Sequence, residues 1–502
     1  MKALLMYPDR DFDFQQTLPW NEQNLTQDLD LLTLLNAMAG GDEFVLEVVR
    51  KVLLLSVPTV EVVLHRQAIL RDCLRNSSLI RDLYKIATDA VEAEKRDWWR
   101  TSSHYASSML YGSNKLLTVL VDVLRKLRNI AEQHGAEVSS TGFGKLFTMF
   151  REEFNEPYLG EIEKHLAVLR FEGGVLISSA LGGINEGVDY ALRQSRDPKK
   201  RWFERLLNKP SGYTLLVDPR DETGGRIVSE MRAKGICRVA IVLAEAADHV
   251  ANFFAMLKSE LAFYVGCLNL YDALTTKGLP ICFPTVAQAG QRRLSSTGLY
   301  DVCLALRLDS GLVPNSTNAD GKDLVVITGA NQGGKTTFLR SIGVAQLMMQ
   351  CGAFVGAEAF RAELCSALVT HFKREEDATM QSGKLDEELS RMSDIINHIG
   401  PNSLLLLNES FAATNDREGS EIARQIVNAL LEGRAKICYV THLHQFAQEL
   451  FDKQIQDVLF LRPQRDDDGR RTFVIREGRP LHTSFGSDLY ESVFGTDIFH
   501  RA

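Results

Sequence analysis

The stretch LVVITGANQGGKTTFLR, residues 324–340, decides the fold of the C-terminal half. Its residues Gly329, Gly334, Lys335 and Thr336 fit the spacing G-x-x-x-x-G-K-[ST], between an apolar run and a helical pattern. Glycines let backbone N–H groups turn inward onto phosphate oxygens, and the positive end of the following helix dipole favours anions. The stretch therefore predicts a phosphate-binding loop between a buried strand and a helix.

This loop predicts roles for two side chains. Lys335 is expected to reach the β- and γ-phosphates of a nucleotide, and Thr336 is expected to hold Mg²⁺. The sequence therefore predicts ATP and Mg²⁺ as cofactors.

A second motif, SLLLLNES at residues 403–410, ends a strongly apolar run with polar residues. Four leucines predict a buried parallel strand, and ligands of α/β sheets bind at the carboxyl ends of such strands. Glu409 is the candidate general base for water, although it could instead cap the following helix. Asn408 stands where an acid that supports Mg²⁺ is usual, so we expect weakened metal binding and slow hydrolysis.

A third motif, YVTHLHQF at residues 439–446, places His442 directly after another apolar run. At a strand end this imidazole would sense or orient the γ-phosphate. A structural role for a lone histidine is the alternative.

Working outward, strands and helices alternate from this region to about residue 450, which predicts a parallel α/β sheet. VLFLRP and TFVIRE predict a hairpin after it. Residues 25–170 and 246–276 follow helical periodicity, and residues 171–240 predict a small strand-containing insertion. The expected fold class is α/β plus all-α, with a helical domain at 1–290 and a P-loop ATPase domain at 291–502.

Composition excludes several classes of protein. The chain has 502 residues, 45% of them hydrophobic, 57 basic and 65 acidic residues and a net charge of −8, so it is neither disordered nor basic overall. Its eight cysteines form no C-x-x-C pair, which predicts reduced thiols and no zinc site. No signal peptide or membrane-spanning helix is expected, and we expect a cytoplasmic protein.

The three motifs, in this order and spacing, resemble those of the MutS family of DNA mismatch-repair ATPases. The family's T-G-P-N-M-G-G-K-S-T stands here as residues 328–337, its Walker B segment as residues 408–415 and its T-H-Y as residues 441–443. GLVPNSTN, with Asn315, resembles the lead-in to the P-loop strand, and HTSFGSDL resembles the K-S-Y-G segment. The resemblance implies a nucleotide site made of Gly329, Asn331, Gly333, Gly334, Lys335, Thr336, Thr337, Ser382 and Gly383.

The likeness continues more weakly into the helical half. HRQAILRDCL resembles the family's core helix, and residues 246–274 resemble its long lever helix. The resemblance implies that the insertion at 171–240 is clamp-like, because the family has its clamp insertion there. No mismatch-reading segment precedes the core, so we expect a short MutS-like protein with little preference for a mispair. Ser382 and Gly383 stand in an altered form of the signature segment that reaches across a dimer, which implies a homodimer with composite ATP sites. An exposed polar loop is the alternative for these two residues.

A basic stretch at residues 193–209 holds seven basic and two acidic residues around Trp202 and Phe203. Such a patch could neutralise phosphates and stack on a base, or it could be a solvated loop. The candidate contacts to double-stranded or branched DNA are Arg196, Lys199, Lys200, Arg201 and Trp202. A nucleotide-gated protein-interaction scaffold without DNA recognition is the second hypothesis, and a transporter-type ATPase is disfavoured because QSGKLDEEL is not an LSGGQ-like segment.

Overall fold

Two compact units make up the chain in the computed structural model. The helical unit contains Met1–Leu4 and Ser78–Lys258, and the sheet unit contains Leu5–Ser77 and Ser259–Ala502. The structure describes residues 1–55, 59–96, 105–172, 174–184, 186–193, 213–330, 332–374, 383–466 and 471–480.

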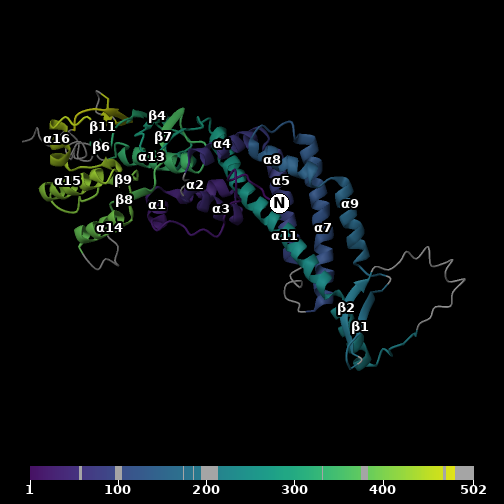
Figure 1. Ribbon diagram of the computed structural model, residues 1–502. Coiled ribbons are helices and arrows are strands. Elements are labelled where there is room, and N and C mark those ends of the chain that lie inside the picture. The colour runs from purple at the N-terminus through teal and green to yellow at the C-terminus, as the bar shows by residue number, and fades with distance from the viewer. Residues whose placement is uncertain are drawn as a thin grey trace, which may run out of the picture. The chain divides into compact units, whose positions relative to one another are not determined.

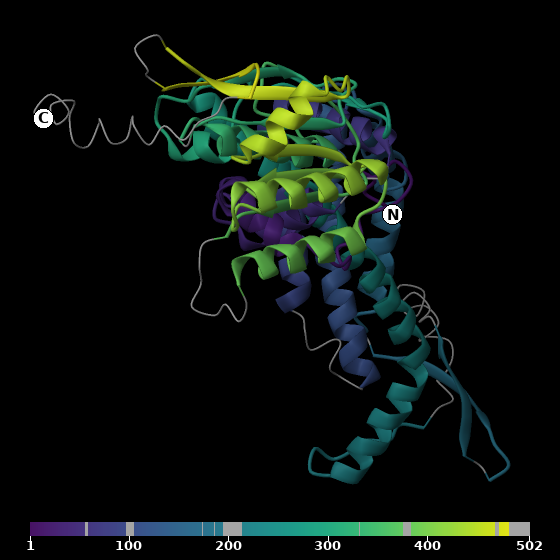
Figure 2. The same ribbon diagram turned by 90° about the vertical axis from the view of Figure 1, so that its left-hand side faces the viewer.

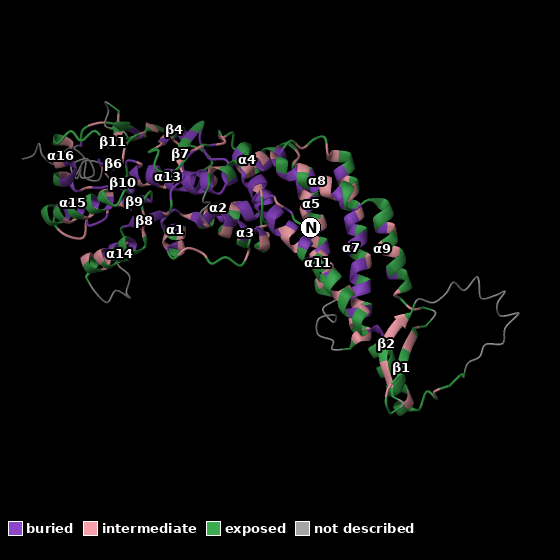
Figure 3. Ribbon diagram, in the orientation of Figure 1, coloured by how far each residue is buried: buried purple, intermediate pink, exposed green. Residues whose placement is uncertain are grey.

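The helical unit packs long helices along one another (Figure 1). These helices are α5 (Ser77–Arg96), α7 (Ala106–His134), α8 (Thr141–Glu152), α9 (Glu156–Val168) and the first part of α11 (Glu222–Thr276). Arg125 of α7 pairs with Glu156 and Glu163 of α9 at 3.2 and 2.9 Å. Burial follows the inner helix faces, while outer faces such as that of α9 stay exposed (Figure 3). Within the range 25–170, the helices predicted after residue 77 are thus confirmed where the structure describes the chain.

A two-stranded antiparallel sheet, β1 (Leu176–Leu181) and β2 (Gly187–Arg193), lies against α7 and α11. Leu192 of β2 packs on a small buried cluster of Leu110, Ile236 and Ala240. The predicted strand-containing insertion is therefore correct for residues 176–193.

The insertion does not extend to residue 240 as predicted, because residues 222–240 belong to α11. The buried residues Ile236, Ala240, Ala247 and Ala251 recur at intervals of four and seven residues along one helix face. Asp221 accepts a hydrogen bond from the Gly224 amide at 2.9 Å, which supports the start of the helix. Residues 213–218 form no strand either.

Helix α11 also bears on the expectation that no helix could span a membrane. It contains an 18-residue window with a mean hydropathy of 1.4, of which 28% is buried, and by length and composition alone this helix could cross a membrane. A packed helix of a globular protein passes the same test, and Phe254, Leu261 and Tyr264 of α11 are buried in the structure.

The sheet unit is built on a six-stranded sheet in the order β12-β11-β6-β10-β9-β8. Its strands are β6 (Leu324–Ile327), β8 (Leu368–Phe372), β9 (Leu404–Asn408), β10 (Lys436–Val440), β11 (Val458–Arg465) and β12 (Arg471–Glu477). Only β12 runs antiparallel to its neighbour. The predicted parallel α/β sheet and C-terminal hairpin are confirmed.

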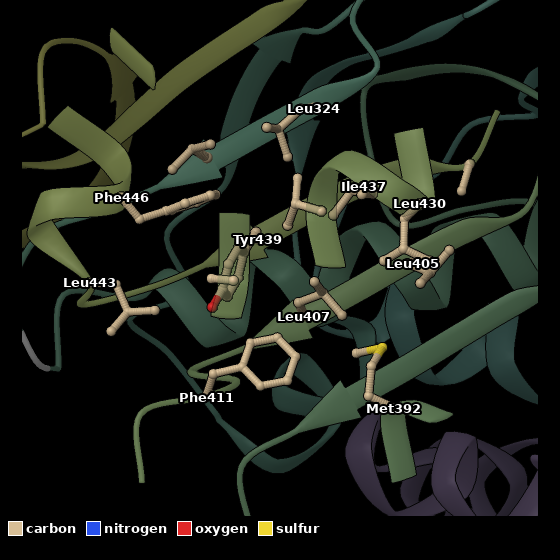
Figure 4. Packing of buried hydrophobic residues seen from close by; sticks show 14 of the residues in the cluster. Leu324, Met392, Leu405, Leu407, Phe411, Leu430, Ile437, Tyr439, Leu443 and Phe446 are labelled. Carbon is tan, nitrogen blue, oxygen red and sulfur yellow. The ribbon is translucent and has the colours of Figure 1, made fainter. Parts of the chain in front are cut away.

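Helices cover both faces of this sheet. Helix α13 (Lys335–Gln350) contacts β9 and β10, whereas α14 (Lys384–His398), α15 (Asp416–Glu432) and α16 (His444–Asp452) cover a buried apolar cluster. In that cluster Leu407 and Tyr439 of the sheet meet Met392, Leu430 and Phe446 of the helices (Figure 4). The apolar strands predicted from their leucine and isoleucine runs therefore form the core beneath the site.

A second, four-stranded sheet was not predicted. It has the order β3-β7-β4-β5, formed by β3 (Thr285–Ala287), β7 (Ala359–Glu363), β4 (Leu294–Leu299) and β5 (Asn315–Asn318). The remaining helices of the sheet unit are α1 (Glu22–Asp28), α2 (Leu31–Ala39), α3 (Glu43–Leu54), α4 (Val60–Arg75) and α12 (Val302–Arg307).

The predicted domain boundary at residue 290 does not coincide with the division into units, because residues 5–77 and 259–290 pack in the sheet unit. Buried polar side chains explain this. Glu260 of α11 accepts hydrogen bonds from the Leu5, Met6 and Phe12 amides at 2.6, 3.3 and 2.7 Å, and burial raises its pKa to about 7. Arg66 of α4 donates to the Met6 carbonyl and to the Cys351 carbonyl just after α13.

Candidate nucleotide-binding site

The carboxyl ends of three neighbouring parallel strands meet at one edge of the sheet. Val440 of β10 stands beside Ile327 of β6 and beside Asn408 of β9. The predicted phosphate-binding loop, the Asn408–Glu409 pair and His442 follow these three strand ends. Register alone therefore brings the three sequence motifs together.

The loop after β6 has the backbone conformation that its glycines permit. Gly329 has φ +127° and Gly334 has φ +87°, in the region that residues with a Cβ rarely adopt. A Cβ built on Gly329 or on Gly333 would lie 2.8 Å from the Pro463 ring of β11. Gly334 precedes the first turn of α13, so backbone N–H groups at this helix end face the loop.

Lys335 lies inside this loop and is only 4% exposed. Its Nζ donates hydrogen bonds to the carbonyls of Gly329 and Ala330, both at 2.7 Å. Burial lowers the pKa of Lys335 to about 8, while the Glu409 carboxylate opposes that shift. A buried ammonium held only by neutral carbonyls has a strong electrostatic preference for an anion in the loop.

Thr336 and Asn408, the predicted metal-site residues, are in direct contact. The Thr336 hydroxyl donates to Asn408 Oδ1 at 2.9 Å. Two oxygens are thus presented at the base of the loop, which is the donor type that Mg²⁺ prefers. Neither oxygen carries a charge, so the pair fits the metal in chemistry but attracts it less than a carboxylate would.

Glu409 and His442 form the third contact of the site. His442 Nε2 and Glu409 Oε1 lie 2.9 Å apart, and both side chains are about one-quarter exposed. The hydrogen bond from His442 holds the pKa of Glu409 below its usual range, against the opposing effect of burial. Glu409 is therefore an ionised, partly accessible carboxylate.

A buried network positions the turn that carries Glu409. Glu409 and Phe411 have φ +53° and +64°, an uncommon conformation for residues with a side chain. Between them, Ser410 bonds to His371 Nδ1 at 2.7 Å and donates to the His371 carbonyl at 2.8 Å, and Tyr439 donates to the Ser410 carbonyl at 2.6 Å. Burial lowers the pKa of His371 to about 4, so this histidine is neutral. Sequence reasoning missed His371, because nothing local marks a histidine within an apolar strand as a support for the turn.

A cleft of about 340 Å³ opens against the loop and contains Lys335, Thr336, Thr337 and Glu409. Its far wall is apolar and consists of Leu304, Leu308, Leu312, Val313 and Phe473. Asn315 holds the apolar wall together by bonding its own segment to β12, since its amide donates to the Phe473 carbonyl and its Oδ1 accepts from Ile475 N. Phe473 and the apolar wall were not predicted, because they come from segments remote from the loop in sequence.

Several predicted site residues lie outside the described residues, namely Asn331, Ser382 and the five candidate DNA contacts Arg196, Lys199, Lys200, Arg201 and Trp202. Gly383 is described and caps the start of α14, where a Cβ would meet nothing within 4 Å. The predicted contacts of these residues with a partner or with DNA remain predictions.

The parallel sheet, the glycine loop with its lysine and the strand-end Glu409–His442 pair define the nucleotide-binding domain of a P-loop ATPase. Comparison with known proteins agrees: residues 325–486 match the family model of MutS domain V, an ABC-type ATPase, and residues 58–277 match the MutS2 N-terminal domain. The chain therefore belongs to the MutS family.

The similar curated relatives are bacterial DNA mismatch repair proteins MutS. The protein from Synechococcus sp. (strain JA-2-3B'a(2-13)) is 32% identical over 284 residues, which is 53% of this chain and 29% of that protein. The protein from Synechococcus sp. (strain WH7803) is 25% identical over 58% of this chain and 37% of its own length. That from Syntrophomonas wolfei is 30% identical over 33% and 19%, respectively. The chain thus spans well under half the length of these relatives.

Proposed function

We propose that this chain binds ATP with Mg²⁺, hydrolyses it slowly and couples its nucleotide state to clamping of double-stranded or branched DNA as a homodimer. The observation that carries the proposal is one cleft lined by Lys335, Thr336 and Glu409. Asn408 is bonded to Thr336 and His442 to Glu409 directly behind it.

The residues of the cleft fit ATP by their chemistry. Lys335 and the amides at the start of α13 would hold the phosphates, once Lys335 Nζ exchanges the Gly329 and Ala330 carbonyls for phosphate oxygens. The apolar wall with Leu312 and Phe473 suits a purine base. On ATP binding, the buried Lys335 ammonium would exchange neutral hydrogen-bond partners for charged phosphate oxygens. Hydrogen bonds between charged groups are the stronger ones, which favours tight binding of ATP.

Slow hydrolysis follows from the residues beside the loop. Thr336 and Asn408 would hold Mg²⁺, and the metal supplies neutralisation of charge on the transferring phosphoryl group. Because Asn408 brings no charge, we expect weaker metal binding. Glu409 would orient the attacking water and accept its proton, while His442 keeps that carboxylate ionised.

DNA clamping and dimerisation are supported by the relatives and by two features of the chain. The relatives are DNA mismatch repair proteins, and the basic stretch 193–209 follows the β1–β2 hairpin of the helical unit. The open start of α14 at Gly383 would offer amides to the nucleotide of a second copy, completing a composite site. Localisation in the cytoplasm is part of the same proposal.

The test compares two variants in the full chain. Lys335→Ala should lose most ATP binding, whereas Glu409→Gln should bind ATP and turn it over at a rate reduced by about a hundredfold or more. The exposed Lys453→Ala is the matched control and should behave like the wild type. Full turnover by Lys335→Ala, measured as phosphate release, would exclude this cleft as the nucleotide site.

The DNA part is tested separately, by titrating fluorescent duplex and branched DNA with and without ATP. Replacing Lys199 and Lys200 by Gln should weaken binding and flatten its salt dependence. Salt-independent or absent DNA binding, with ATP binding intact, would favour a nucleotide-gated protein-interaction scaffold instead.

A further inference from the structure

A second cleft lies on the other side of the phosphate-binding loop, against the β11–β12 hairpin. It measures about 450 Å³ and is lined by Arg462, Arg465, Arg471 and Arg476, with Glu477 as its one described acidic residue. Loop residues Gly329, Ala330 and Gly333 form its floor. The hairpin is the yellow pair of strands at the top of Figure 2. This cleft shares Gly333 and Phe473 with the nucleotide cleft but contains neither Lys335 nor Glu409.

The register of the hairpin places these arginines opposite each other. Arg462 pairs with Arg476, and Arg465 pairs with Arg471, across the two antiparallel strands. Directly opposite side chains share one face of a sheet, and like charges in that position destabilise the pairing. Two such arginine pairs therefore destabilise the pairing of β11 with β12, and a bound anion would offset this destabilisation.

In the structure, Arg471 and Arg476 have neutral hydrogen-bond partners. Arg471 Nη1 donates to the amide oxygen of Gln332 at 2.6 Å, and Arg476 Nε donates to that of Gln464. Among the described residues, no ion pair includes Arg462, Arg471 or Arg476. Other arginines of the same unit do pair with carboxylates, including Arg292 with Asp323, Arg293 with Asp320, Arg307 with Asp30 and Arg424 with Glu449. The charges of Arg462, Arg471 and Arg476 are therefore not neutralised by an ion pair with any described carboxylate.

An aromatic ring completes the cleft. Phe473 lines it, is 45% exposed and has φ +60°, a conformation rare for an aromatic residue. Its neighbour in the cleft, Pro463, is packed against Gly329 and Gly333. Guanidinium groups match phosphate in a planar fork, and an exposed ring can stack on a base. An acidic protein segment would use the arginines but not the ring.

We propose that this arginine cleft binds the sugar–phosphate backbone of single-stranded nucleic acid, with a base on Phe473. The site is additional to the DNA contact proposed for residues 193–209. Arg471 is bonded to Gln332 of the phosphate-binding loop, and Phe473 lines both clefts, so the strand and the nucleotide contact the two sides of one loop. Occupation of one cleft therefore changes affinity in the other.

The test uses Arg462→Gln with Arg476→Gln, which removes one opposed pair and touches no residue of the nucleotide cleft. The control pair is Arg361→Gln with Lys453→Gln, two exposed basic residues of the same unit with the same change in charge. A labelled 20-nucleotide single strand is titrated into the full chain at several salt concentrations. We expect the hairpin variant to bind about tenfold more weakly or worse. The slope of log K against log salt should fall by about 1.4, at roughly 0.7 for each phosphate that the variant no longer neutralises.

Two further measurements locate the site. A photoreactive thymidine strand should crosslink to residues 458–480 of the wild type, and the strand should alter ATP turnover in the wild type and control but not in the hairpin variant. Unchanged affinity and salt slope in the hairpin variant would overturn the proposal. So would a polyglutamate chain that competes fully for the arginines while the strand does not bind there. Loss of strand binding only in the Lys199→Gln, Lys200→Gln variant would also overturn it, while leaving the proposed function standing.

Discussion

Asn408 is the residue through which we propose that metal binding and hydrolysis are weakened at this site. Its Oδ1 accepts the Thr336 hydroxyl at 2.9 Å, a bond that an aspartate of the same size would keep. Asn408→Asp therefore adds charge beside the metal position with little change of geometry. We expect the Mg²⁺ concentration for half-maximal turnover to fall about tenfold, equivalent to about 1.4 kcal/mol, and turnover to rise.

The experiment measures ATP turnover against Mg²⁺ for both forms, with the exposed Asn397→Asp of α14 as control. The opposite result is also informative. If the wild type already saturates at low Mg²⁺ and the variant gains nothing, the amide is suited to its site. A second carboxylate would then only raise the pKa of Glu409 by repulsion.

The next prediction concerns His442, which in our proposal acts through the pKa of Glu409 and is not itself the base. Its hydrogen bond is the largest cause of the lowered pKa of Glu409. His442→Ala removes that bond, so the pKa of the carboxylate rises and the ionised base is lost at a higher pH than in the wild type. The acid limb of the turnover–pH profile should therefore move to higher pH, with recovery toward the alkaline plateau.

His444→Ala, two residues further along, is the control and should leave the profile in place. Loss of turnover by one constant factor at every pH would show that His442 touches the phosphate itself instead of acting through Glu409.

Among the elements, α15 fixes the turn that bears Glu409 through a close backbone approach. A Cβ at Gly419 would lie 2.6 Å from the Phe411 carbonyl, in a helix whose backbone cannot easily withdraw. Gly419→Ala should therefore shift residues 409–411, lower the free energy of unfolding by about 1–3 kcal/mol and reduce turnover more than ATP affinity.

Gly160→Ala in α9 is the matched control, since nothing lies within 4 Å of its Cβ position. It should gain up to about 1 kcal/mol from helix propensity. Chemical denaturation and turnover assays compare both variants. Equal stability changes in the two would mean that the Gly419 contact is not restrictive.

Elements with a strong local pattern were predictable from sequence. Examples are the strand–loop–helix at 324–350 and the leucine strand before Glu409. In each of them, hydrophobic periodicity, residues that end the element and a recognisable motif lie within one short stretch. The four-stranded sheet was not predictable, because its short strands pair residues far apart, such as Ser295 with Arg361. The start of α11 was hidden by Gly224 and Gly225 and by outward-facing apolar residues such as Ile227 and Val228.

The same distinction holds within the site. Lys335, Thr336, Asn408, Glu409 and His442 were all predicted, because each follows a recognisable strand end. Phe473 and Arg471 were not, since Arg471 meets Gln332 from 139 residues away and only tertiary pairing brings them to the loop. Sequence motifs thus predict which polar side chains meet at this edge of the sheet, while the walls of the cleft depend on long-range packing.

At the scale of the whole molecule, the proposed composite ATP site gives Gly383 a role only in the contact between two copies of the chain. It has φ −64° and ψ 151°, which any residue can adopt, and its Cβ position is open. Gly383→Trp should therefore fold and bind ATP like the wild type. If the start of α14 meets the nucleotide of a second copy, the indole blocks that approach.

We therefore expect Gly383→Trp to stay monomeric with ATP in sedimentation velocity, in a Glu409→Gln background that holds the nucleotide, and to lose most turnover in the native background. Gly400→Trp is the control, since it lies in the same unit with an equally open Cβ position and no predicted role in the site. A large ring there should leave the ATP-dependent dimer intact, which separates a specific block from a general effect of surface tryptophan. An ATP-dependent dimer that persists in Gly383→Trp would remove the start of α14 from the interface, while Lys335 and its cleft would keep their proposed role.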